Sequence, residues 1–184
     1  MRILLISGSL RRDSHNTKLL RAAAELLPPG TEVERFDALK AIPPFDEDDE
    51  AAGAPAVTAL RAAIDRADGV LFATPEYNGS VPGHLKNALD WVSRPVATTE
   101  LRGKPVAVVG ASTSLFGAVW AQAELRKVLA TIGAQVVDRE LPVMHAHERF
   151  DASGALVEDE LRDELSAHVA ELVDAAGERA AVAA

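Results

Sequence analysis

The chain has 184 residues, of which 48% are hydrophobic and 26% charged, so we expect one globular domain over residues 1–184. Its net charge of −9 argues against nucleic acid as a partner, because binding phosphates requires a basic surface. The chain has no cysteine, which excludes disulfides and thiolate chemistry and favours the cytoplasm. No apolar stretch is long enough to cross a membrane, and the start carries no signal-peptide pattern.

Two hydrophobic patterns predict the strands. Three runs are apolar throughout, which is typical of strands buried on both faces of a parallel sheet, and they cover residues 2–7, 70–74 and 105–111. Residues 32–36 alternate polar and apolar side chains, and residues 135–138 form a short run. We therefore expect the last two at the edges of the sheet.

Each predicted strand is followed by a segment in which apolar residues recur at helical spacing. The first helix is expected to begin near Asn16 or Thr17, and a loop rich in proline and acid covers residues 38–55. We expect the alanine-rich tail from about Gly177 to be frayed. The apolar positions of the five predicted helices are Leu20, Ala23, Ala24 and Leu27; Val57, Leu60, Ile64 and Ala67; Leu85, Ala88, Leu89 and Val92; Leu125, Val128, Leu129 and Ile132; and Leu161, Leu165, Val169 and Leu172.

This alternation of strands and helices predicts an α/β fold, in which a five-stranded parallel sheet lies between two layers of helices. Placing the apolar strands in the middle gives the strand order 2-1-3-4-5. The winding direction then reverses between the first and third strands, and ligands of such sheets bind at that point, outside the carboxyl ends of the strands.

The loop after the first strand, residues 8–17, has the composition of a phosphate site. Gly8 permits a sharp turn, and Arg11 offers a positively charged fork that matches phosphate oxygens. The free N–H groups of the following helix add to these, and hydroxyl and amide groups come from Ser9, Ser14, Asn16 and Thr17. The loop is neither a P-loop nor a dinucleotide motif. The alternative interpretation is a polar loop in which Ser14 or Asn16 only caps the helix.

The loop after the third strand begins at Pro75 and is suited to a flat ring. Glu76, Tyr77, Asn78 and Gly79 expose several backbone groups, Tyr77 can pack beside a ring, and the Asn78 amide can both donate and accept. The alternative is an ordinary connection between a strand and a helix. After the fourth strand, Ser112 can reach the same ring or a sugar chain; the alternative is a loop that enters the next helix, with Thr113 or Ser114 as its cap. A phosphate site beside a ring site indicates a mononucleotide, and FMN fits best.

The two loops together resemble the NADPH-dependent FMN reductase family, which includes bacterial quinone and chromate reductases. The matching residues are Gly8-Ser9-x-Arg11-x-x-Ser14-x-Asn16 and the run from Pro75 to Trp91. One departure is Gly117-Ala118, where many members have paired glycines.

This resemblance implies a flavodoxin-like, three-layer fold and non-covalently bound FMN. It implies a two-step (ping-pong) reaction in which NADPH or NADH is the reductant and a quinone, azo compound, free flavin or metal oxyanion is the small-molecule acceptor. It also implies a homodimer or homotetramer. The FMN contacts that it implies are Ser9, Arg11, Ser14, Asn16, Glu76, Tyr77, Asn78, Gly79 and Ser112.

Several other residues are not expected to bind a metal or the flavin. His145, His147 and Glu148 suit a surface loop better than a metal site, since nothing supplies a third and fourth ligand. Trp91 and Trp120 are expected to serve packing or an interface rather than flavin stacking. No general acid or base is predicted, because the cofactor carries the redox chemistry.

Two other functions fit the same fold. One is a flavodoxin-type electron carrier without a nicotinamide site. Carriers of this kind commonly sandwich the flavin between aromatic side chains, and only 4% of this chain is aromatic. The other is a non-catalytic binding or sensor module, which would show no steady turnover with a quinone.

Overall fold

A parallel sheet forms the centre of the computed structural model, which describes residues 1–183. The strand order β2-β1-β3-β4-β5 confirms the prediction, and every neighbouring pair is parallel. The central strands β1, β3 and β4 are buried, whereas β2 is largely exposed at one edge. The bounds are β1 (Arg2–Ser7), β2 (Glu32–Phe36), β3 (Gly69–Thr74), β4 (Pro105–Ala111) and β5 (Gln135–Val136).

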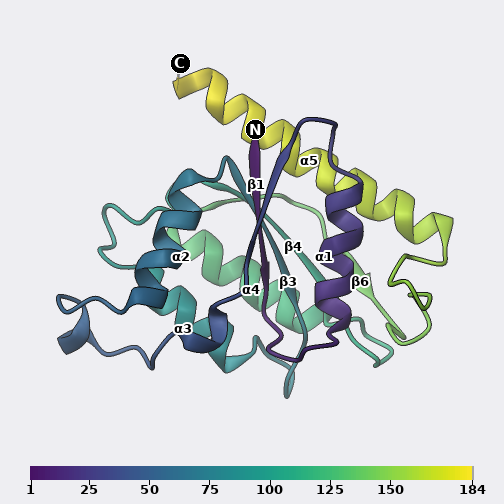
Figure 1. Ribbon diagram of the computed structural model, residues 1–184, viewed down its shortest axis with the longest axis horizontal. Coiled ribbons are helices and arrows are strands. Elements are labelled where there is room, and N and C mark those ends of the chain that lie inside the picture. Colours follow the sequence, from purple (N-terminus) through teal and green to yellow (C-terminus); the bar gives the residue numbers. More distant parts are fainter. Residues whose placement is uncertain (184) are drawn as a thin grey trace.

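Five α-helices cover the two faces of the sheet (Figure 1). The helices α2, α3 and α4 bury one hydrophobic cluster against it, and α1 and α5 bury a second cluster on the opposite face. In residues 1–183 no helix is long and apolar enough to cross a membrane. The bounds are α1 (His15–Glu25), α2 (Pro55–Arg66), α3 (Gly83–Val92), α4 (Val119–Ile132) and α5 (Asp159–Ala183).

The edge beside β4 differs from the prediction, because two short strands share it. β5 pairs with the start of β4 at Pro105 and Val106, and a sixth strand, β6 (Pro142–Val143), pairs with its end at Gly110 and Ala111. The signal for β6 was weak but present, since Leu141 and Val143 alternate with exposed neighbours and are both buried. β6 matters for the site because it supports the last residues of β4.

The end of α5 also differs from the prediction. The helix continues through Gly177 to Ala183 and is not frayed from that glycine onward. Ala176 is buried, and the residues after Gly177 are rich in alanine, the strongest helix former. This composition offsets the cost of about 1 kcal/mol that a glycine brings to a helix interior.

The long loop between β2 and α2 packs on α3 and contains two short 3-10 turns, Leu39–Ala41 and Glu47–Asp49. Trp91 on α3 is buried there: its indole N–H donates to the Pro43 carbonyl at 2.9 Å, and its ring meets Phe45 edge-on at 5.1 Å. The expectation that Trp91 serves packing is confirmed.

Candidate functional site

The loops that follow β1, β3 and β4 meet at one end of the sheet, the lower end in Figure 1, and enclose a cleft of about 280 Å³. This is the predicted position, where the winding of the sheet reverses. Of the residues expected to bind the cofactor, all line the cleft except Thr17, Asn78 and Gly79. The lining residues are Ser9, Arg11, Ser14, His15, Asn16, Pro75, Glu76, Tyr77, Ala111, Ser112 and Thr113.

The turn at the end of β1 requires glycine. The Gly8 N–H donates to the Ala73 carbonyl at 2.8 Å, which ties this turn to the end of β3. A Cβ at Gly8 would lie 2.8 Å from the Leu85 side chain and therefore could not fit without a shift. The first loop is thus held close to both β3 and α3.

Two polar residues at the start of α1 are used by the protein itself. Ser14 is the N-cap, and its hydroxyl accepts from the Asn16 N–H at 3.2 Å. The Asn16 amide donates to the Ala111 carbonyl at 2.9 Å and accepts from the Ala111 N–H at 3.0 Å. Asn16 is only 2% exposed, so its side chain fastens the start of α1 to the end of β4. Thr17, which lies outside the cleft, donates to Ser7 at 3.2 Å.

Positive charge on the same loop remains available. Arg11 is exposed, and within residues 1–183 it has no carboxylate partner. The neighbouring acid, Asp13, is paired with Lys18 at 3.1 Å, and this hydrogen bond lowers the pKa of Asp13. The cleft therefore presents a guanidinium that no nearby carboxylate neutralises.

His15 adds a ring to the wall of the cleft and stacks on Phe150 with 6.1 Å between ring centroids. Its Nδ1 is buried and has no hydrogen-bond partner. Partial burial lowers the pKa of His15, with further contributions from Arg11 and Lys18. From the sequence, His15 could equally contact a ligand or face solvent, because a single histidine in a loop carries no pattern.

The loop after β3 is a small hairpin. Tyr77 and Ser80 exchange backbone hydrogen bonds of 3.1 and 3.2 Å, and between them Asn78 and Gly79 have φ values of 55° and 73°. Two successive left-handed residues of the sequence Asn-Gly are typical of a type I′ turn. The turn places Asn78 and Gly79 at the exposed tip of the hairpin, while Tyr77 lines the cleft.

Two carboxylates clamp this hairpin to α4. The Glu76 carboxylate accepts from the N–H groups of Trp120 and Ala121, at 3.0 and 3.1 Å, in the first turn of the helix. In return, Glu124 of α4 accepts from the Ser80 hydroxyl at 2.6 Å and the Val81 N–H at 3.2 Å, and these bonds lower the pKa of Glu124. Both bonds to Glu76 use Oε2, so this carboxylate is held against α4.

The loop after β4 is supported by β6. The Ser112 N–H donates to the Val143 carbonyl at 3.1 Å, and its carbonyl accepts from the Ala146 N–H at 3.0 Å. Further along, Gly117 and Ala118 are both left-handed, with φ values of 56° and 63°. A Cβ on Gly117 would lie 2.6 Å from the Pro142 backbone, so glycine is required there but not at the next position. The departure at Ala118 is thus accommodated by the backbone.

These residues fit a phosphate-bearing cofactor such as FMN. The cleft combines the unpaired Arg11 guanidinium, hydroxyl groups and the unpartnered His15 ring nitrogen, which together suit a phosphate and a polar chain. Its volume of about 280 Å³ is just below the range of roughly 300–1,000 Å³ that is usual for clefts that enclose most of a drug-sized ligand. A mononucleotide would therefore extend beyond the cleft and leave part of its ring accessible.

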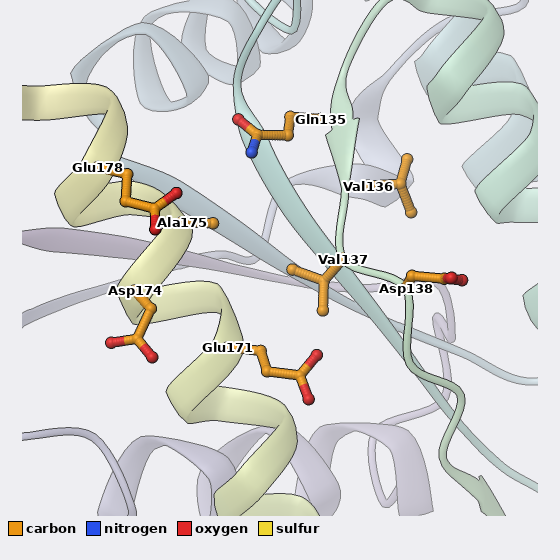
Figure 2. Close-up of a pocket in the computed structure, with 8 residues that line it drawn as sticks. All are labelled: Gln135, Val136, Val137, Asp138, Glu171, Asp174, Ala175 and Glu178. Carbon is orange, nitrogen blue, oxygen red and sulfur yellow. The ribbon is translucent and has the colours of Figure 1, made fainter. Parts of the chain in front are cut away.

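A second groove lies at the other end of the sheet, between β5 and α5 (Figure 2). It has a volume of about 330 Å³, and Asp138, Glu171, Asp174 and Glu178 line it. Asp138 is paired with Arg126 and Glu171 with Arg139, at 2.6 and 2.7 Å. Its chemistry does not suit an anionic ligand.

The structure brings no cluster of metal ligands together. Within residues 1–183, no group of three or more His, Asp or Glu side chains is placed to hold a metal ion. His145 and His147 lie edge-on to each other at 6.2 Å, and His147 contacts Glu148 at 3.2 Å.

Known proteins support the same interpretation. The family model of NADPH-dependent FMN reductases matches residues 1–148. An NAD(P)H-dependent FMN reductase of Pseudomonas aeruginosa is 44% identical over 165 residues, which cover 89% of this chain and 88% of that protein. A 2-hydroxy-1,4-benzoquinone reductase of Burkholderia is 38% identical over 163 residues, 88% of each chain.

A solved structure agrees in fold. The flavoenzyme NAD(P)H:(acceptor) oxidoreductase FerB of Paracoccus denitrificans superposes with a TM-score of 0.88 and 32% identity, over 96% of this chain and 97% of that one. The fold, the cleft and these likenesses agree. The chain belongs to the NADPH-dependent FMN reductase family.

Proposed function

We propose that the protein uses FMN in the cleft to transfer electrons from NAD(P)H to small acceptors, with quinones as the main class. The single observation that carries this proposal is the meeting of three loops at the switch point: the loop with Arg11, the hairpin with Tyr77 and the loop with Ser112 line one cleft. FMN as cofactor and NAD(P)H as co-substrate follow from the family to which the chain belongs.

Each side of the cleft would hold a different part of the cofactor. Arg11, the hydroxyl groups of Ser9 and Ser14 and the free N–H groups at the start of α1 suit the phosphate. The backbone from Pro75 to Tyr77 and the Ser112 loop suit the ring, and the Glu76 and Glu124 clamps keep that side rigid. Asn78 and Gly79 would contribute by shaping the hairpin.

Bound FMN supplies the hydride and electron transfer chemistry. The protein's part is to bind and orient the cofactor and to leave one side of its ring open, as the small volume of the cleft requires. NAD(P)H and the acceptor would use that open side in turn, which is a two-step (ping-pong) mechanism. No side chain of the cleft needs to act as a general acid or base.

The class of acceptor rests on the relatives. By their names, the two relatives given above reduce flavin or a quinone. A third relative, a quinone reductase of Escherichia coli, is 39% identical over 141 residues, 76% of this chain and 74% of that protein. We extend this class to our chain, together with free flavin, azo compounds and metal oxyanions. One domain over residues 1–184, a homodimer or homotetramer and a cytoplasmic location complete the proposal.

Rapid-mixing kinetics test this function. The FMN-loaded protein is mixed anaerobically with NADPH or NADH, and the loss of flavin absorbance is followed before and after addition of 1,4-benzoquinone. We expect the nicotinamide alone to reduce the flavin and the quinone then to reoxidise it. In a separate steady-state assay, double-reciprocal plots of the rate at several quinone concentrations should give parallel lines. Failure of either nicotinamide to reduce the flavin would contradict the proposal and favour an electron carrier.

A further inference from the structure

Three exposed aromatic side chains lie on the loops that follow β3 and β4 and at the start of α4. Within residues 1–183, the aromatic side chains that are exposed are Tyr77, Phe116 and Trp120, and the remaining Phe and Trp residues are buried or half-buried. Phe116 is 52% exposed and Trp120 is 51% exposed. Large aromatic rings gain several kcal/mol from burial, so two of them exposed side by side require an explanation.

Phe116 and Trp120 form a pair with 4.8 Å between ring centroids and 53° between ring planes. The backbone brings them together, because the left-handed residues Gly117 and Ala118 turn the chain sharply between the Ser112 loop and α4. The buried Ala118 and the close approach of Gly117 to Pro142 fix this turn. The pair is therefore built into the fold rather than placed on a loose loop.

Short hydrogen-bond paths connect the pair to both walls of the cleft. On one side, the Trp120 N–H donates to the Glu76 carboxylate at 3.0 Å. On the other side, the Phe116 N–H donates to the Ser114 hydroxyl at 3.4 Å, and the Ser114 hydroxyl accepts from the Ser112 hydroxyl at 3.1 Å. Since Glu76 and Ser112 both line the cleft, the backbones of Trp120 and Phe116 lie one or two hydrogen bonds from the two loops that we assign to the ring.

We infer that Phe116 and Trp120 form a binding subsite for the planar ring of a quinone acceptor. This inference rests on the proposed function and adds the residues that select the acceptor. A cleft that holds only part of FMN leaves the acceptor outside, at the rim, and the aromatic pair offers a flat apolar surface there. Quinone rings pack on aromatic side chains, whereas a hydrated anion gains nothing from them.

The size of the pair favours a small ring over a second protein chain. An aromatic side chain buries about 150–250 Å² when fully covered, so two half-exposed rings offer roughly 200 Å². A stable protein interface needs about 800 Å² from each partner. Leu115, which precedes Phe116 in the chain, is also exposed and adds apolar surface, and a bicyclic quinone is of the size to cover this area.

The test compares the variants Phe116→Ala and Trp120→Ala with the wild type as FMN-loaded protein. Both side chains are exposed, and the Trp120 hydrogen bond to Glu76 uses the backbone, so we expect the melting temperature and FMN affinity to stay unchanged. Val96→Ala is the control, because it removes an exposed apolar side chain from the loop before β4. Trp120→Phe keeps a ring at the rim and should retain most of the function.

We expect each alanine variant to raise the KM for 1,4-naphthoquinone about 3- to 10-fold, the range for a lost aromatic contact. The KM for ferricyanide, which has no planar ring, should not change. An equal change for ferricyanide or an unchanged KM for the quinone would overturn the inference. So would a lower molar mass in solution, because the pair would then be a subunit contact.

A binding measurement separates this inference from the proposed function. Calorimetric titration of the oxidised holoprotein with 2-naphthol, a planar ring that is not reduced, needs no turnover. Binding that weakens in Trp120→Ala and not in Val96→Ala supports the subsite even if NADPH fails to reduce the flavin. No difference between the wild type and Trp120→Ala contradicts the subsite even if quinone reduction proceeds.

Discussion

At the carboxyl ends of β1, β3 and β4, a cleft of about 280 Å³ exposes Arg11 and several hydroxyl groups, whereas a groove of about 330 Å³ between β5 and α5 is lined by four carboxylates. The two hollows are similar in size, so volume does not distinguish them. Charge and hydrogen bonding do, because only the cleft offers an unpaired guanidinium and free donors to a phosphate.

The largest effect is expected from Asn16→Ala. The change leaves the N–H and carbonyl of Ala111 unpaired and buried, and each costs about 1–3 kcal/mol. We expect the free energy of unfolding to fall by about 3 kcal/mol in urea titrations, and FMN affinity to fall with it. Thr17→Val is the matched control, since it removes one hydrogen bond to Ser7 and should cost about 1 kcal/mol or less. Equal losses in both variants would contradict the assigned role of Asn16.

The next largest effect is a loss of stability at low pH, caused by His168 on the buried face of α5. Burial lowers the pKa of His168 to about 4, and Glu171, Arg139 and Arg126 are the charged groups that act on it. Since its folded pKa lies below the unfolded value of about 6.5, the unfolded chain binds the proton first as the pH falls. Stability should be lost between pH 6.5 and 4, by up to about 3 kcal/mol.

Urea titrations at several pH values check this prediction, with His168→Leu as the comparison. The difference in unfolding free energy between wild type and variant isolates His168 from the carboxylates that both proteins share. We expect this difference to change between pH 6.5 and 4 and to be level above pH 7. A difference that is constant over the whole range would show that His168 does not titrate as the structure requires.

A smaller effect is expected from Arg11→Gln. Removing a charge-assisted contact costs about 1.5–3 kcal/mol, which corresponds to a 10- to 100-fold weaker binding of FMN. Fluorescence titration measures it, with Arg12→Gln as the neighbour control, which is also exposed but does not line the cleft. Because Arg11 is exposed and unpaired, the melting temperature should not change. Riboflavin, which has no phosphate, should bind the wild type and Arg11→Gln equally.

Substitutions in the groove between β5 and α5 are expected to have no effect on cofactor binding. The double variant Asp174→Asn, Glu178→Gln removes two carboxylates from its wall and should leave the dissociation constant of FMN unchanged (Figure 2). The same fluorescence titration checks this. A change as large as that of Arg11→Gln would mean that the two hollows are coupled or that the ligand lies in the wrong one.

The strand order could be predicted from the sequence because the pattern of apolar residues in a strand depends on how deeply that strand is buried. Continuous apolar runs placed β1, β3 and β4 in the middle of the sheet, and polar loops after them identified the cleft. Local patterns suffice where a residue's environment is set by its neighbours in the chain. The sequence Asn78-Gly79 is also typical of a tight hairpin turn, but we did not predict from it that both residues lie at the tip of the hairpin, outside the cleft.

Long-range partners account for what could not be predicted. The Asn16 amide bonds Ala111, 95 residues away, and Glu76 bonds the start of α4, which no local spacing indicates. Trp120 was expected to serve only packing or an interface, and no pattern indicated that Glu124, on the same helix, bonds the hairpin. β6 is too short to stand out from the loop around it, since two residues give hardly any periodicity.

A crystal structure of the protein with FMN would locate the cofactor. We expect its phosphate beside Arg11 and the start of α1, and its ring against the backbone of Pro75 to Tyr77, with the open side of the ring toward Phe116 and Trp120. FMN bound elsewhere, or a phosphate that lies away from Arg11, would contradict this expectation.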